Sequence, residues 1–131
     1  MKIAFSDFWH GFDPSNNLLT NIFKEVYSDV QVTNPFACDL LIYCASNWAS
    51  NNHRTISNCK KIGFNGECVP NPNYNECDYS ITSFFNSYDG RNIRIPLWMF
   101  YVDWYNTGSW ENPGWLVPVD YLTKPNKFSL K

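Results

Sequence analysis

The sequence predicts a single α/β domain built on an open, mostly parallel sheet flanked by helices. Three observations support this class: 131 residues suit one domain, short apolar strands alternate with a helical pattern, and the segment DLLIYCA at residues 39–45 is continuously apolar. Continuous apolar runs are typical of parallel strands covered on both faces. Strands that alternate with crossovers favour a parallel sheet, here expected to have four or five strands.

The first elements are a strand and a helix. The segment KIAF, residues 2–5, is a short apolar strand. Asp13 and Pro14 predict the start of the helix, with Asp13 as the N-cap and Pro14 at the first helical position. Apolar side chains then form two adjacent rows on one helix face, at positions 18, 22 and 26 and at positions 19, 23 and 27.

The remaining elements are mostly strands. Alternating valines indicate a strand at residues 30–32, and the central strand follows at 39–45. A polar loop and a short helix around residues 54–59 precede three more candidate strands, at 60–64, 78–85 and 92–98. From residue 99 onward, tryptophans and prolines occur without a clean period. We therefore divide the chain into an α/β domain, 1–98, and an aromatic, irregular peripheral segment, 99–131.

Composition and motifs exclude several functions. The net charge is −2 and no basic block occurs, which disfavours a nucleic-acid partner. No stretch approaches the roughly 18 apolar residues of a membrane span. The sequence contains no GxGxxG, P-loop or Gly-x-Ser-x-Gly motif, so no nucleotide-phosphate cradle or hydrolase elbow is expected. The five cysteines include no C-x-x-C pair, so no metal site is predicted, and their odd number favours reduced thiols in the cytoplasm.

Polar and aromatic side chains follow the first, third and fourth candidate strands of this series. In open α/β sheets ligands bind outside the carboxyl ends of the strands, so these three loops should share one edge. A sugar suits such a mixture, because aromatic rings can cover its apolar face while polar groups bind its hydroxyls. The candidate residues at this edge are Asp7, Phe8, Trp9, His10, Trp48, Asn65, Gly66 and Glu67.

The same residues allow plainer interpretations. Glu67 can be a solvated carboxylate or a helix cap, and Asp7 can cap a loop. Trp9 and Trp48 can pack in the core or under a lid. From these patterns alone, the sequence indicates an α/β domain with a polar and aromatic edge.

Four blocks of the sequence resemble the amino-terminal domain of the bacterial α-1,3-fucosyltransferases, glycosyltransferase family ten. The blocks are KIAFSDFWHGFDPSNN, CDLLIYCA, KKIGFNGECVPNPNYNECDYSITSFF and RNIRIPLW. They occur in the order and spacing of the family and together span about residues 2–98. The Gly-Glu turn, followed by prolines and asparagines and then an Asp-Tyr strand, is a fairly specific feature.

The resemblance implies one Rossmann-like half of a two-domain, GT-B-like enzyme. This half would face the acceptor oligosaccharide, typically at an N-acetylglucosamine. A carboxyl-terminal domain, absent here, would bind the donor GDP-fucose, so this domain itself is expected to bind no cofactor. This chain is expected to be cytoplasmic with no membrane span, and the full-length enzyme can be peripheral to the membrane.

The resemblance also implies roles for single residues. Glu67, next to Gly66, matches the glutamate proposed as the general base. It would take the proton of an acceptor hydroxyl that attacks the fucose anomeric carbon with inversion, and Asp7 is the next candidate for this base. The loop from Asp7 to His10 matches a region expected to line the acceptor side.

The chain also departs from the family pattern. Asn65 and Cys68 stand where threonine and asparagine are common, and Thr82-Ser83 replaces a glycine that usually precedes phenylalanine. These changes concern acceptor specificity more than the type of reaction. Nothing after residue 98 resembles the donor-binding domain. The alternative is therefore a non-catalytic glycan-binding or partner-interaction module of the same fold, which would bind a glycan without turnover.

Overall fold

A computed structural model describes residues 1–46, 49–67, 73–83, 90–96 and 99. Its described strands form one sheet in the order β2-β1-β3-β4-β5-β6, and every neighbouring pair is parallel. The strands are β1 (Lys2–Ser6), β2 (Gln31–Val32), β3 (Leu40–Cys44), β4 (Lys60–Asn65), β5 (Tyr79–Thr82) and β6 (Asn92–Arg94). The predicted α/β class is confirmed. The sheet has six strands instead of four or five, because the short β2 and β6 both pair at its edges.

The helix α1, Leu18–Val26, begins later than the sequence predicted. The carboxylate of Asp13 accepts hydrogen bonds from the backbone N–H and the hydroxyl of Ser15, at 2.8 and 2.7 Å, and so closes a turn before the helix. Asn17 is the N-cap, and its side-chain oxygen accepts the backbone N–H of Thr20 at 3.0 Å. The expectation that Asp13 caps this helix is therefore wrong, because its carboxylate binds Ser15 in the preceding turn.

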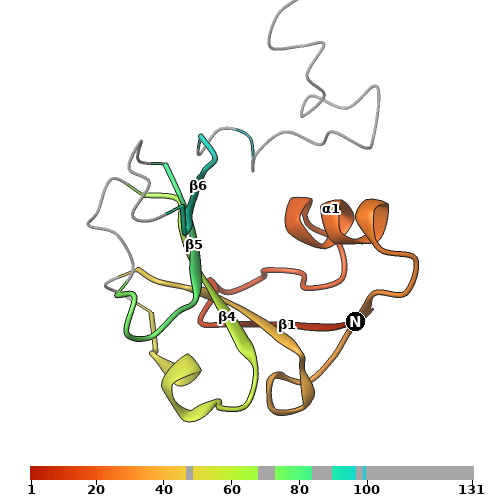
Figure 1. Ribbon diagram of the computed structural model, residues 1–131, viewed down its shortest axis with the longest axis horizontal. Coiled ribbons are helices and arrows are strands. Elements are labelled where there is room, and N and C mark those ends of the chain that lie inside the picture. Colours follow the sequence, from red (N-terminus) through yellow and green to blue (C-terminus); the bar gives the residue numbers. More distant parts are fainter. Residues whose placement is uncertain (47–48, 68–72, 84–89, 97–98, 100–131) are drawn as a thin grey trace, which may run out of the picture.

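One face of the sheet is covered by α1, as Figure 1 shows. Only one of the two predicted apolar rows of the helix packs there: Leu19 is buried and Phe23 is partly buried against the core, whereas Ile22 and Val26 are exposed. The main core lies between this helix and the sheet. Its buried members are Ile3, Phe5, Leu19, Ile42, Cys44, Phe64 and Ile81.

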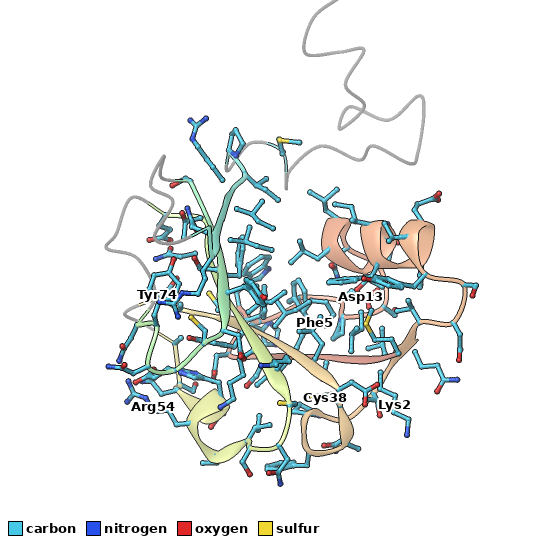
Figure 2. The ribbon with its side chains drawn as sticks, viewed as in Figure 1. Lys2, Phe5, Asp13, Cys38, Arg54 and Tyr74 are labelled. Atoms are coloured by element: carbon cyan, nitrogen blue, oxygen red, sulfur yellow. The ribbon has the colours of Figure 1, made fainter. Side chains whose placement is uncertain are left out.

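The other face of the sheet carries the connections through two short 3-10 helices, η1 (Pro35–Ala37) and η2 (Asn52–Thr55) (Figure 1). A smaller apolar cluster lies on this side, made of Ala4, Cys38, Leu41 and Ile56. Phe5 and Cys38 mark the two sides of the sheet in Figure 2. Farther along, on β3 to β5, this face carries buried polar and aromatic side chains instead, namely Tyr43, Asn65, Ser80 and Thr82.

The carboxyl ends of β1, β3 and β4 lie at one edge of the sheet, because the three strands are parallel neighbours. The expectation that their loops share this edge is confirmed. The chain runs from β1 to β2 on one side and then returns to β3 on the other, so the strand order reverses between β1 and β3. A crevice at such a reversal is the usual ligand site of open α/β sheets.

The predicted peripheral segment lies almost entirely outside the described residues. The segment 99–131 is described only at Met99, and so the division at residue 98 stays a prediction. Within the described part of the chain, α1 and the 3-10 helices are all too short to cross a membrane.

Candidate functional site

Glu67 lies at the carboxyl end of β4, two residues after Asn65, the last residue of the strand. The side-chain oxygen of Asn65 accepts its backbone N–H at 3.0 Å, and the hydroxyl of Ser83 donates to its carbonyl oxygen at 3.4 Å. Glu67 itself is exposed, and no hydrogen bond or ion pair joins its carboxylate to another described residue. The backbone of Glu67 is thus held by Asn65 and by Ser83, and its side chain is exposed.

Asn65 is the last residue of β4 and is only 1% exposed. Its Oδ1 accepts the N–H of Glu67, which sets the orientation of the amide, because a flipped amide would place two donors against each other. Its Nδ2 is buried and has no hydrogen-bond partner in the described part of the chain. Buried donors without a partner are rare and are often found at functional sites.

The loop between β1 and α1 packs an aromatic cluster against the end of β4. Phe8 stacks on Phe12, with ring centroids 4.1 Å apart, and lies parallel to Phe64 at 5.7 Å. Trp9 contacts the edge of Phe12 at 5.2 Å and is 49% exposed. These rings border a pocket of about 280 Å³, called here the aromatic groove, whose lining is Phe8, Trp9, Gly11, Phe12, Asp13, Asn16, Asn17, Leu18, Leu19 and Phe64.

Two positive φ angles shape this loop. Asp7 has φ 63°, in the left-handed region that aspartate and asparagine tolerate better than most side chains. Gly11 has φ 83°, which favours glycine, and the backbone N–H of Phe12 donates to the carbonyl of Trp9 at 3.2 Å. The chain therefore turns sharply at Asp7 and again at Gly11, and the rings between these turns face the groove.

The carboxylate of Asp7 is fully buried, with 0% side-chain exposure. It accepts the backbone N–H of Asn52 at 2.8 Å and that of His53 at 2.9 Å, and it contacts the Nδ1 of His53 at 2.8 Å. Burial raises the pKa of Asp7, but these hydrogen bonds from His53 and Asn52 outweigh burial and hold the pKa below its ordinary value. Asp7 thus has a structural role in this conformation, and its contact with an acceptor stays a prediction.

His53 is the buried histidine of this edge, and the sequence analysis did not single it out. It is 2% exposed, and its ring stacks on Tyr43 with centroids 3.8 Å apart. Its Nε2 contacts the carboxylate of Glu76 at 3.0 Å, and that carboxylate also pairs with Arg54 at 3.0 Å. The hydrogen bonds from His53 lower the pKa of Glu76, burial opposes them, and Arg54 adds to the lowering. His53 lies 46 residues from Asp7, and no sequence pattern indicates a contact over that separation.

The other predicted site residues have varied positions. His10 is exposed on the β1–α1 loop, and Gly66 is buried between Asn65 and Glu67. Trp48 lies outside the described residues. No group of three or more histidine, cysteine, aspartate or glutamate side chains within the described ranges is arranged to hold a metal ion.

Comparisons with known proteins agree with this architecture. Residues 3–101 match the family model described as the alpha-(1,3)-fucosyltransferase FucT N-terminal domain. No curated protein matches the chain. Three crystal structures of α1,3-fucosyltransferases are similar to it. The structures with GDP-fucose and with GDP each have 25% sequence identity to this chain and a TM-score of 0.53. The third structure has 28% identity and a TM-score of 0.56.

These structural alignments cover most of this chain but a small part of the similar enzymes. Each covers 74% of this chain, whereas the matched part is 26% of the enzymes with GDP-fucose and GDP and 28% of the third. The chain thus spans about a quarter of the length of these enzymes.

Proposed function

The chain belongs to the α-1,3-fucosyltransferase N-terminal domain family, and we propose that it is the acceptor-binding part of a GT-B-like fucosyltransferase. The complete enzyme would transfer fucose from GDP-fucose to a hydroxyl of an acceptor glycan of the N-acetylglucosamine type. The reaction would invert the configuration at the anomeric carbon of fucose.

The observation that carries this proposal is the placement of Glu67. A general base must reach the proton it removes, so it belongs in a loop at the edge where ligands bind. Glu67 is exposed at the carboxyl end of β4, and Asn65 and Ser83 hold its backbone. In the proposed step Glu67 accepts the proton of the acceptor hydroxyl. The hydroxyl oxygen bonds to the anomeric carbon, and GDP leaves with the electrons of the broken carbon–oxygen bond.

The acceptor sugar would lie between Glu67 and the aromatic groove. Trp9 offers a ring surface for the apolar side of a sugar, because about half of its side chain is exposed. Phe8 lines the same groove, with its ring packed on Phe12 and Phe64. Asn65 belongs to the proposed acceptor set through the hydrogen bond by which its side-chain oxygen holds the backbone N–H of Glu67. Gly66, His10 and Trp48 complete the proposed acceptor set, with Asp7 acting from beneath the loop.

The donor would be bound elsewhere. The sequence contains no phosphate-binding motif, and the similar enzymes solved with GDP-fucose and GDP have much longer chains. We therefore assign GDP-fucose to a carboxyl-terminal domain and no cofactor to this one. A cytoplasmic location is part of the same proposal, supported by the odd number of cysteines and by Cys44 within a buried strand.

Two measurements test the function. In NMR titrations of the 131-residue chain, N-acetyllactosamine should shift the resonances of the β1–α1 loop and of Glu67, whereas GDP should shift none. Joined to the donor-binding domain of a related enzyme, the chain should form an α-fucoside from GDP-fucose. Binding of GDP to the chain alone would contradict the assignment of the donor. Glycan binding without turnover in the joined protein would instead favour the non-catalytic module.

A further inference from the structure

The side chain of His53 lies beside the carboxyl ends of β1 and β3. The strand order reverses at this point, where open α/β sheets commonly bind a ligand. Here the ring of His53 lies over Tyr43 of β3 and contacts Asp7, the residue that follows β1. His53 and its partners therefore lie beside the point of reversal in the strand order.

The contacts of His53 determine where its protons lie. Its Nδ1 is 2.8 Å from Asp7 and its Nε2 is 3.0 Å from Glu76. An ionised carboxylate can only accept hydrogen bonds, so this geometry suits a ring that donates from both nitrogens. The ring of His53 thus lies buried between two carboxylates, and the backbone carbonyl of His53 accepts a further hydrogen bond from the ammonium of Lys61 at 2.8 Å.

These ionic contacts join segments on both sides of the proposed acceptor site. Asp7 starts the sharp turn that directs Phe8 and Trp9 to the aromatic groove. Glu76 lies near the end of the β4–β5 connection, and Glu67 is the second residue of the same connection. The ring of His53 is thus tied to the first residue of one flanking segment and to the last turn of the other. Figure 2 shows that neighbouring Arg54 lies on the side of the sheet away from α1.

We propose that His53, as an imidazolium bound by Asp7 and Glu76, is a positioning residue for the acceptor site. This inference rests on the proposed function of the same edge. His53 does not touch the acceptor; it holds the turn at Asp7, and through that turn the ring faces of the groove. Loss of its contacts should weaken acceptor binding and leave the donor site and the proton transfer at Glu67 intact.

The protonation of the ring can be tested on the 131-residue chain without any assay of activity. Long-range proton–nitrogen NMR spectra at pH 7 should show that both ring nitrogens of His53 carry a proton. The exposed His10 in the same spectra is the internal reference for an imidazole in solvent. A spectrum in which either nitrogen of His53 lacks its proton would overturn the proposal.

The positioning role requires kinetics on the chain joined to a donor-binding domain. Asp7→Asn suits this purpose, because asparagine also tolerates φ 63° and removes the charge with little change of shape. The acceptor KM should rise about tenfold, since small misplacements of binding groups have effects of that order. The KM for GDP-fucose and the kcat at saturating acceptor should stay within about twofold. Glu76→Gln, at the other end of the ring, should show the same pattern and serves if the first variant does not fold.

The control and the contrary outcome are equally specific. Lys60→Gln breaks the 2.7 Å surface ion pair with Asp78, which is separate from His53, and should leave all three kinetic constants unchanged. A purely structural role for the network would lower the amount of active protein, and hence the apparent kcat, with the acceptor KM unchanged. That result would overturn the inference. If the unaltered joined enzyme transfers no fucose, the proposed function fails instead, and the NMR result on the ring is unaffected.

Discussion

The side-chain oxygen of Asn65 accepts the backbone N–H of Glu67 at 3.0 Å, while the amide nitrogen of the same side chain is buried without a partner in the described part of the chain. Such an unpaired donor costs about 1–3 kcal/mol of stability. The amide that holds the backbone of the proposed base is therefore retained at an energetic disadvantage. Mutation can separate the contribution of the amide oxygen from that of the amide nitrogen.

Asn65→Ser should preserve the turn, because a serine hydroxyl can accept the N–H two residues ahead, and it removes the unpaired amide nitrogen. Asn65→Ala removes both the hydrogen bond to Glu67 and the unpaired amide nitrogen. In the enzyme joined to a donor-binding domain, we expect kcat within about threefold of the unaltered value for serine and about tenfold lower for alanine. Thermal unfolding monitored on the same preparations separates these effects from loss of folded protein. Equal turnover in both variants would show that the hydrogen bond to Glu67 is unimportant.

Glu67→Gln should lower kcat by about 10²–10⁴, the usual contribution of a general base. Glutamine retains the shape of the side chain and one acceptor, so the melting temperature and GDP affinity should hardly change. The loss should appear in kcat more than in KM, because the missing interaction belongs to the transition state.

Glu25→Gln is the matched control for this variant, since Glu25 is an exposed glutamate of α1 outside the site. It should leave turnover unchanged. If Glu67→Gln retains turnover within about threefold, another group is the base. Asp7, the next candidate from the sequence, would then have to leave its three hydrogen bonds to Asn52 and His53 in order to act.

Trp9→Ala should raise the acceptor KM and lower the free energy of unfolding by only about 1 kcal/mol, because half of this side chain is already exposed. Phe5→Ala is the contrast: Phe5 is buried in the main core, so its truncation should cost about 3–5 kcal/mol. Denaturant unfolding of both variants gives the comparison. A loss for Trp9→Ala as large as that for Phe5→Ala would identify Trp9 as a core residue.

Acid should weaken the fold through Asp7 and Glu76. Both pKa values are lowered in the folded chain, from ordinary values of 3.8 and 4.5. Such groups stabilise the folded state above the ordinary pKa, and this contribution is lost as the pH falls through the lowered pKa. The melting temperature should therefore decrease as the pH is lowered below about 4. This decrease should be smaller in Asp7→Asn than in the unaltered protein. Identical acid profiles for the two proteins would contradict the assignment.

The thiols should react in the order of their burial. Cys38, Cys44 and Cys77 are buried, and all four cysteines of the described part of the chain are free, with Cys59 the most accessible. Burial, with the neighbouring thiol of Cys59, raises the pKa of Cys38 to about 11, so few thiolates are present at pH 8. Alkylation followed by peptide mapping should label Cys59 before Cys38 and Cys44. In denaturant without reductant about five thiols should titrate, and a count near three or one would indicate disulfides.

The sequence by itself determined the class of the fold, its family and the position of Glu67. The apolar run at 39–45 and the short strands around it predicted a parallel sheet, because strands covered on both faces need no alternation. Parallel strands place their carboxyl ends together, so the sequence pattern alone assigns the loops after β1, β3 and β4 to one edge. These results depend on local pattern and on the geometry common to all such sheets.

Only the tertiary structure decided what the acidic and basic groups of this edge do. Asp7 and His53 are 46 residues apart, and their contact depends on how the β3–β4 connection folds back over the sheet, which no periodicity encodes. The start of α1 likewise depends on a competing contact. The carboxylate of Asp13 accepts the backbone N–H of Ser15 in a local turn, and Asn17 caps the helix instead. A short carboxylate side chain accepts hydrogen bonds from the donors that lie close to it in space. The whole fold determines which donors those are.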